Sequence, residues 1–175
     1  DSTTSAAKTL QVSSATKTPT PAPTPKPSAT KSTPCFTVTG RVAQATTFTV
    51  ARLKSLPTFS GTYFSRGKDP KEASTAFVGV RLIDILNAAG VASDAKRVTV
   101  RAADAYSASF TMRQVTADYI DETRPGVILP MIMAYSEDGV PYTGDHPFRL
   151  VMGQSVEGDY NRQYWVRIVV AVEVE

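Results

Sequence analysis

The chain has 175 residues and a mass of 18.8 kDa, which suits one domain with a single hydrophobic core. It is 42% hydrophobic and 20% charged, and no apolar run reaches the ~20 residues of a membrane-spanning helix. The formal net charge of +3 arises within residues 1–34, so the basic and acidic side chains of the remainder balance. Because no basic run is interleaved with aromatic residues, we expect no nucleic-acid partner.

Residues 1–34 differ in composition from the rest of the chain. They contain six of the twelve prolines and neither an aromatic residue nor a glycine, so they cannot bury enough apolar surface to form a core. The alternation TPTPAPTPKP over 18–27 favours an extended polyproline geometry. We predict a linker over 1–34 and a domain over 35–175.

Stalks of Thr, Ser and Pro commonly hold a domain away from a membrane or wall. We therefore expect an extracytoplasmic protein that is secreted, periplasmic or a cell-surface lipoprotein, tethered through its N-terminal segment. A signal sequence or a lipid-anchoring cysteine would precede Asp1. A disordered tail without any targeting role is the alternative.

Cysteine and histidine are too scarce for several kinds of site. Cys35 and His146 are the sole residues of their types, which excludes an internal disulfide and a zinc site with Cys/His spacing. A nucleophilic pair would have to join the two across the domain without a local signature. We expect no catalytic residue and no metal ligand, with Cys35 an incidental or buried thiol.

The first half of the domain has the pattern of short strands followed by one clear helix. Residues 52–56 predict a helical turn ended by Pro57, and RGKDPK over 66–71 predicts an exposed loop. Runs rich in β-branched and aromatic residues predict strands over 36–39, 47–50, 62–65 and 74–78. A helix is expected from Val80, with Gly90 as its left-handed stop and a core face made by Leu82, Ile83, Leu86 and Ala89.

The second half is again rich in predicted strands, with one helical segment over 114–119. The strands are expected over 97–102, 106–112, 129–135 and 148–152. A last strand over 166–174 alternates a buried face (Val166, Ile168, Val170, Val172, Val174) with an outer face (Trp165, Arg167, Glu173, Glu175). Many strands with segregated helices predict an α+β fold with a mixed or mainly antiparallel sheet.

Four colinear segments resemble the oxidoreductase molybdopterin-binding domain family, whose fold sulfite oxidases and their bacterial relatives share. AFVGVRLIDILNAAGV over 76–91 resembles the family's GVxLxxLLxxAGV segment, and DAYSASF over 104–110 resembles its DGYS element. IMAYSEDGVPYTGDHPFRLVM over 132–152 resembles nGxPL…GxPxRLvvP, and YWVRIVVAVEV over 164–174 resembles the closing KWv..I strand. The resemblance implies a sulfite-oxidase-type fold of mixed β-sheets with few short helices over residues 36–175.

The resemblance also implies a cofactor, but one element of the catalytic members is missing. In those members a cysteine thiolate on the loop before the GVxL helix ligates molybdenum. Here that loop is TYFSRGKD over 62–69, with Ser65 near the expected place and no cysteine after Cys35. A serine alkoxide is a harder ligand and much costlier to deprotonate than a thiolate. We therefore expect a pterin or molybdopterin without molybdenum.

A pterin is a flat heterocycle that needs aromatic walls and a few placed donors and acceptors. Tyr63, Tyr106 and Trp165 are candidate walls, and Asp104 is a candidate acceptor for pterin N–H groups. Arg149 and His146 are candidate donors, and Arg66 and Lys68, with Gly67 between them, are a candidate anion-binding loop beside Ser65. Structural alternatives are core packing for the aromatic residues, a turn cap for Asp104, an ion pair for Arg149, and solvated loops for Arg66 and His146.

Three functions are compatible with these residues. The first is an exported domain that binds a small heterocyclic ligand for sensing or delivery, with a membrane protein as a candidate partner. The second is a molybdenum-dependent oxidoreductase of the sulfite oxidase type with an unusual ligand. The third is a protein-interaction scaffold without a ligand.

A truncation tests the linker. Removing residues 1–34 should leave the melting temperature nearly unchanged, because their composition provides no core. Calorimetric melting of the full chain beside the truncated chain measures this. A drop of more than a few degrees would show that the segment packs on the domain.

Overall fold

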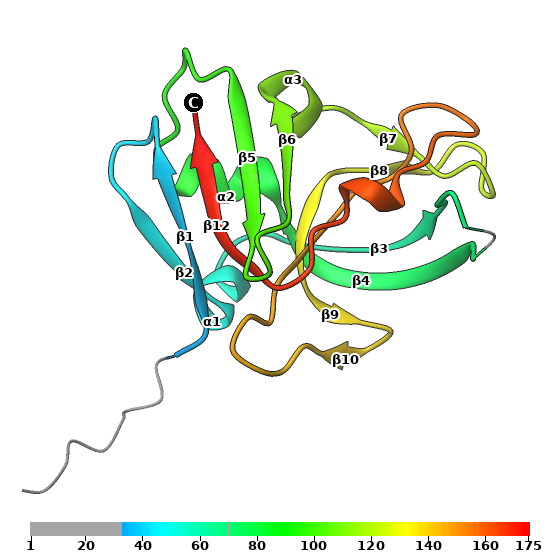
Figure 1. Cartoon of the computed structure of the whole chain (residues 1–175), viewed down its shortest axis with the longest axis horizontal. Coiled ribbons are helices and arrows are strands. Elements are labelled where there is room, and N and C mark those ends of the chain that lie inside the picture. The colour runs from blue at the N-terminus through cyan, green and yellow to red at the C-terminus, as the bar shows by residue number, and fades with distance from the viewer. Residues whose placement is uncertain (1–32, 70) are drawn as a thin grey trace, which may run out of the picture. The chain divides into compact units, whose positions relative to one another are not determined.

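The computed structural model describes residues 33–69 and 71–175, and Figure 1 shows its ribbon. The expected linker over 1–34 therefore lies almost entirely outside the described residues, and the first strand begins at Cys35. The elements are β1 (Cys35–Gly40), β2 (Thr46–Thr49), α1 (Val50–Lys54), β3 (Thr58–Ser65), β4 (Ala73–Arg81), α2 (Leu82–Ala88), β5 (Arg97–Ala102), β6 (Ser107–Thr111), α3 (Met112–Val115), β7 (Tyr119–Ile120), β8 (Ile128–Leu129), β9 (Ile132–Glu137), β10 (Val140–Pro141), β11 (Arg149–Val151), the 3₁₀ helix η1 (Arg162–Tyr164) and β12 (Val169–Val174).

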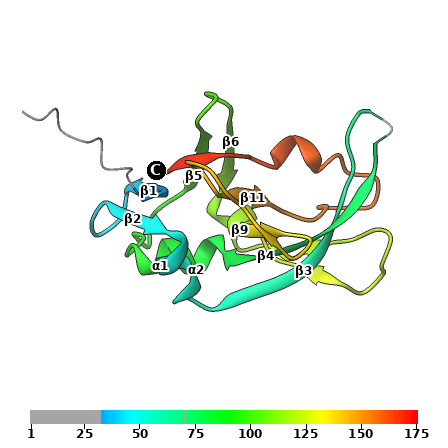
Figure 2. The same ribbon diagram turned by 90° about the horizontal axis from the view of Figure 1, so that it is seen from below.

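Two sheets form the framework of the domain. The first has the strand order β2-β1-β12-β5-β6, in which β1 and β12 are parallel and every other pair is antiparallel. The second has the order β10-β9-β4-β3, with β11 also paired to β9, and is antiparallel throughout. Figure 2 shows α1 and α2 side by side beneath the first sheet. The prediction of mixed sheets with few short helices is confirmed.

The core lies between the sheets and the helices. Phe36 of β1 stacks on Phe48 of β2 and meets Phe148 edge-on at 4.9 Å between ring centroids. Such aromatic pairs add to the stability that their buried area provides. Among the described residues, no helix is both long enough and apolar enough to cross a membrane.

The predicted helix over 80–89 is present, with a corrected register. Strand β4 continues to Arg81, so the helix begins at Leu82 rather than near Val80. Ile85 is fully buried, whereas Ile83, which was expected in the core, is half-buried. Gly90 has φ of +72° and ends the helix as expected.

The last strand is shorter than predicted, and its buried face is different. Ile168 has φ of +48° and is 39% exposed, so strand β12 starts only at Val169. A register shift between Val169 and Ala171 then breaks the simple alternation. As a result Val170 is half-buried, and Trp165, expected on the outer face, is buried. A positive φ at a β-branched residue is not visible in an alternating pattern.

Two other segments differ from their predictions. The helix expected over 114–119 is the single turn α3, which Thr111 and Gln114 cap reciprocally. The strand expected over 129–135 is divided at Pro130, which lacks the N–H that a continuous ladder needs. Its two parts pair with different partners, β8 with β7 and β9 with β4.

The buried face of α2 yields a stability prediction. Leu86→Ala should lower the free energy of unfolding by about 2–5 kcal/mol, because Leu86 is fully buried and its loss leaves a cavity. Asn87→Ala on the exposed face of the same helix is the control and should change it by less than about 0.5 kcal/mol. Urea unfolding measures both. A cost under about 1 kcal/mol for Leu86→Ala would contradict the packing described.

Candidate functional site

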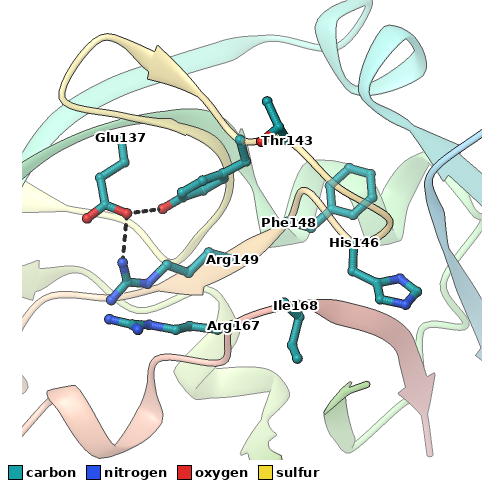
Figure 3. Close-up of a pocket in the computed structure, with 8 residues that line it drawn as sticks. Glu137, Thr143, His146, Phe148, Arg149, Arg167 and Ile168 are labelled. Carbon is teal, nitrogen blue, oxygen red and sulfur yellow. Dashed lines mark hydrogen bonds and ion pairs between the residues drawn. The ribbon is translucent and has the colours of Figure 1, made fainter. Parts of the chain in front are cut away.

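A cavity of about 350 Å³ lies between the β9–β10 hairpin, the segment before β11 and the residues before β12. Figure 3 shows the guanidinium groups of Arg149 and Arg167 at the same end as Glu137, with His146 and Ile168 at the other end. The lining residues are Glu137, Tyr142, Thr143, His146, Phe148, Arg149, Arg167 and Ile168.

Arg149 is held by an ion pair and by contacts with two aromatic rings. Its Nη1 donates to Glu137 Oε2 at 2.9 Å, and the same oxygen accepts from the Tyr142 hydroxyl at 2.5 Å. The guanidinium carbon lies 5.0 Å from the Trp165 ring centroid and 5.3 Å from that of Phe77. Burial, followed by the bond to Glu137, raises the pKa of Tyr142, so its hydroxyl stays protonated. Arg149 is therefore fixed in one position.

Two of the residues that line this cavity each have a polar side-chain atom without a partner. His146 Nδ1 and Arg149 Nε are buried and form no hydrogen bond within the described part of the chain. An unpaired buried donor or acceptor costs about 1–3 kcal/mol, so such atoms mark places that a water or ligand completes. Both atoms belong to residues that were predicted to bind a ligand.

Two more cavities are linked to the first through shared lining residues. One of about 250 Å³ shares Arg167 with it and is also lined by Ala102, Asp104, Tyr106, Arg162, Gln163 and Trp165. Another, of about 370 Å³, shares Arg162 and Gln163 with the second and is lined by Gly67, Lys68, Asp69 and Tyr160. We refer to the three cavities, linked by these shared residues, as the arginine groove.

Asp104 and Tyr106 occupy a tight turn between β5 and β6. Asp104 Oδ1 accepts from the Tyr106 backbone N–H at 3.1 Å, while Ala105 has φ of +69°. Asp104 thus caps the turn, and its Oδ2 accepts no hydrogen bond from the residues described. The Tyr106 hydroxyl donates to the Gln163 carbonyl, so the 45% exposed tyrosine crosses the second cavity.

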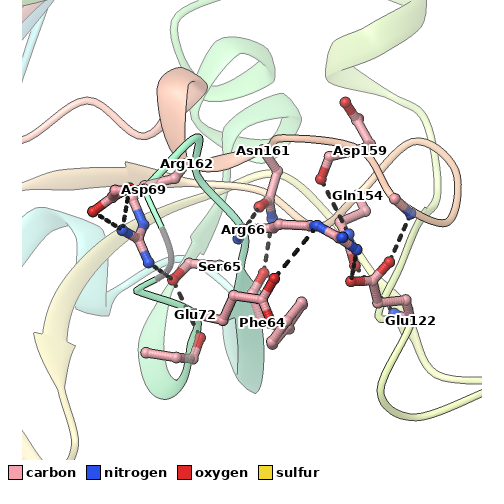
Figure 4. A network of polar contacts seen from close by, with 12 residues as sticks. Phe64, Ser65, Arg66, Asp69, Glu72, Glu122, Gln154, Asp159, Asn161 and Arg162 are labelled. Atoms are coloured by element: carbon pink, nitrogen blue, oxygen red, sulfur yellow. Dashed lines mark hydrogen bonds and ion pairs between the residues drawn. The ribbon is translucent and has the colours of Figure 1, made fainter.

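Ser65 ends β3 and is buried beside Arg162. Its Oγ donates to the Ala73 carbonyl at 3.2 Å and accepts from Arg162 Nη2 at 3.3 Å. Arg162 Nη1 also bonds both carboxylate oxygens of Asp69, at 3.1 and 3.2 Å (Figure 4). The Ser65 hydroxyl is therefore already engaged on both sides.

The side chains that line the groove have the chemistry needed to hold a pterin and an anion. Cys35 lines none of the three cavities, and the domain has no other thiol. Within 33–69 and 71–175, no three His, Cys, Asp or Glu side chains gather as a metal site. Guanidinium groups, aromatic rings and a free carboxylate oxygen match the phosphate, the face and the N–H edge of a phosphorylated pterin.

Arg66 belongs to a neighbouring polar network and not to the groove. It pairs with Glu122 at 2.7 Å and with Glu72 at 3.4 Å, and it lines none of the three cavities. Glu122 also accepts from the Gly158 N–H at 2.6 Å and donates its own N–H to Gln154 Oε1 at 3.1 Å (Figure 4). These carboxylates already balance the charge of Arg66, and its expected anion-binding role stays a prediction.

Tyr63 is a core residue and not a wall of the groove. Its exposed fraction is 0%, and its hydroxyl donates to the Pro130 carbonyl at 2.8 Å. The ring packs edge-on against Phe59 and Phe77, and burial raises the pKa of its hydroxyl. The alternation of β3 directs this side chain inward.

Five of the residues predicted to contact the ligand meet in the arginine groove: Asp104, Tyr106, His146, Arg149 and Trp165. Gly67 and Lys68 of the predicted anion-binding loop line its third cavity. Ser65 adjoins the groove through Arg162, which was not predicted. Arg167, Glu137 and Tyr142 were also missed, although all three lie within segments that resemble the family's motifs. No local signal marks Arg162, since its partners Ser65 and Asp69 are more than ninety residues away in the sequence.

The polar network around Glu122 predicts a pH effect. Partial burial by itself raises the Glu122 pKa, but bonds from Gly158, Gln154 and Arg66 lower it below its ordinary value of 4.5. Because the Glu122 pKa is lower in the folded than in the unfolded state, the ionised carboxylate stabilises the fold at pH values above the unfolded-state pKa. This stabilisation is lost as the pH falls through the lowered pKa of the folded state. Glu122→Gln should therefore melt below wild type at pH 7, and the gap should narrow towards pH 3. A difference in melting temperature between Glu122→Gln and wild type that stays constant from pH 7 to pH 3 would contradict the lowered pKa of Glu122.

Comparison with known proteins agrees with the resemblance of the sequence motifs. The profile of the oxidoreductase molybdopterin binding domain family matches residues 22–174. No curated protein sequence matches the chain. The crystal structure of the sulfane dehydrogenase SoxCD from Paracoccus pantotrophus is similar, with a TM-score of 0.62 and 20% identity over 84% of this chain.

The chain spans 39% of the length of that SoxCD chain, so the likeness concerns the fold of one part of it. The family profile covers both sheets, all three cavities of the arginine groove and the four motif segments. The chain therefore belongs to the oxidoreductase molybdopterin binding domain family and has its sulfite-oxidase-type fold.

Proposed function

We propose that this domain binds a phosphorylated pterin of the molybdopterin class in the arginine groove and performs no molybdenum redox chemistry itself. The observation that carries the proposal is the pair of buried, unpartnered atoms, Arg149 Nε and His146 Nδ1, on two residues that line the same cavity as Arg167. The family to which the chain belongs supports a cofactor of this class.

Each end of the groove suits a different part of such a ligand. Arg167 forms no ion pair with the described residues, so its charge is available to a phosphate, next to the unpartnered Nε of Arg149. Trp165 and Tyr106 offer aromatic surface in the second cavity, and Asp104 Oδ2 offers an acceptor for ring N–H groups. His146 adds a hydrogen bond at the far end of the first cavity.

The residues of this chain bind and orient the ligand. A molybdopterin that carries molybdenum supplies redox chemistry when bound, but Ser65 is engaged by Ala73 and Arg162 and no thiol lines the groove. Binding without catalysis is therefore favoured. A sulfite-oxidase-type oxidoreductase remains the second candidate, because the family match supports it equally.

The biological setting follows from the N-terminal composition. The Thr- and Pro-rich residues 1–34 support an extracytoplasmic domain that is held by a spacer. In that setting the domain would sense a pterin or deliver it to a membrane-bound partner protein.

Calorimetric titration with neopterin phosphate tests the proposal. Arg149→Ala and Asp104→Ala should each weaken binding by about tenfold or more, since a charge-assisted hydrogen bond contributes about 1.5–3 kcal/mol. Ser65→Ala should weaken it less, because a neutral hydroxyl contributes less than a charge. Arg113→Ala is the control, an exposed arginine on α3 that lines no part of the groove, and should bind as wild type.

Elemental analysis of the purified protein separates the alternatives. Stoichiometric molybdenum that Ser65→Ala removes would contradict the proposal and establish the oxidoreductase. Absence of binding to neopterin phosphate, together with absence of bound metal or pterin, would contradict it and leave the interaction scaffold.

A further inference from the structure

Asn161 is a fully buried polar residue immediately before η1, between Tyr160 and Arg162, which both line the arginine groove. We infer that Asn161 is a positioning residue, whose carboxamide fixes Ser65, Arg162 and Trp165 relative to one another. The inference rests on the proposed function, since it explains how the walls of that binding groove are held.

The carboxamide of Asn161 makes three hydrogen bonds to backbone groups, and Figure 4 shows those with Arg66 and Phe64. Its Oδ1 accepts from the Arg66 N–H at 2.9 Å, and its Nδ2 donates to the Phe64 carbonyl at 2.8 Å and the Met152 carbonyl at 3.0 Å. Both amide hydrogens are thus used, and the exposed fraction of the residue is 0%. A buried amide with complete partners has one orientation, so its geometry is strongly determined.

The same carboxamide replaces a missing neighbour strand at β3. This strand is an edge of its sheet, and its outward backbone groups flank Ser65: the Phe64 carbonyl on one side and the Arg66 N–H on the other. Asn161 donates to the first and accepts from the second, as a residue of a parallel neighbour strand would. The Arg162 backbone N–H then donates to the Arg66 carbonyl at 3.1 Å and extends the pairing. Ser65 is therefore fixed from outside its own sheet.

Asn161 also helps to position Trp165, an aromatic residue that lines the second cavity of the groove. The Met152 carbonyl accepts from Asn161 Nδ2 and, at 2.8 Å, from Trp165 Nε1. The Asn161 carbonyl accepts from the Tyr164 N–H at 2.9 Å and closes the short turn between them. Arg162 and Gln163, the residues shared by two cavities of the groove, lie within this turn. The Asn161 side chain thus links β3, the turn that carries Arg162, and Trp165, whose ring lies against Arg149.

Two substitutions separate positioning from general stability. Asn161→Ala leaves the Arg66 N–H and the Phe64 carbonyl without the partner described. Asn161→Asp keeps the acceptor for Arg66 but places a carboxylate oxygen against the Phe64 and Met152 carbonyls. Burial and these carbonyls disfavour its charged form, and a protonated carboxyl can again donate to one of them. The Asn161→Asp variant should therefore recover as pH falls, whereas Asn161→Ala should not.

The experiment uses the full chain and two readouts. Trp165 is the sole tryptophan, so its emission and its quenching by iodide report the groove wall directly. At pH 7.5 both variants should bind neopterin phosphate at least tenfold more weakly than wild type, with increased quenching. Leu86→Ala, destabilised at a distance from the groove, is the matched control and should keep wild-type affinity and quenching. At pH 5 Asn161→Asp should approach wild type measured at the same pH.

The outcomes that contradict the inference are specific. Wild-type quenching and affinity in folded Asn161→Ala would overturn it. It would also be overturned if Leu86→Ala lost as much affinity and gained as much quenching as the Asn161 variants. If Asn161→Ala fails to fold, absence of any pH-dependent recovery in Asn161→Asp overturns it. Failure of wild type to bind neopterin phosphate would refute the proposed function instead, while the quenching comparison would still decide the role of Asn161.

Discussion

The guanidinium group of Arg149 is buried against two aromatic rings, and its contacts determine the form of the first cavity of the groove. Removing a cation from water is costly unless charge and hydrogen bonds compensate it. Glu137 and the ring faces of Trp165 and Phe77 provide part of that compensation, and Nε remains without a partner. With Arg167 lining the same cavity, the site concentrates positive charge where an anionic group would complete it.

The fold explains how such distant segments meet. Strand β9 pairs with both β4 and β11, which places Glu137 near Arg149 across one sheet. The isolated bridge between Leu150 and Val166 then joins this sheet to the segment that carries Trp165 and Arg167 before β12 enters the other sheet. The groove therefore lies where the chain passes between the two sheets, and its residues depend on this crossing. Clefts at such junctions are common ligand sites.

The sequence predicts much of this arrangement where the signal is local. Hydrophobic spacing locates the helix that contains Leu86, and Gly90 marks its end. The colinear motifs indicate the family and contain the five groove residues that were predicted to bind the ligand. The predicted alternation of the last strand fails at Ile168, because the sequence pattern does not reveal a positive φ at a β-branched residue. Arg162 and Asn161 escape notice for another reason: their contacts with Ser65 and Phe64 join segments far apart in sequence.

The most direct test of pterin binding is the ¹⁵N-resolved signal of the Arg149 Nε–H, assigned by its loss in Arg149→Lys. On titration with neopterin phosphate, this signal should shift in proportion to occupancy and become protected from exchange with water, because the ligand supplies the missing acceptor. Neopterin and inorganic phosphate added separately should shift it less at equal concentration. An unchanged Arg149 Nε–H signal at saturating neopterin phosphate would contradict the proposed binding site.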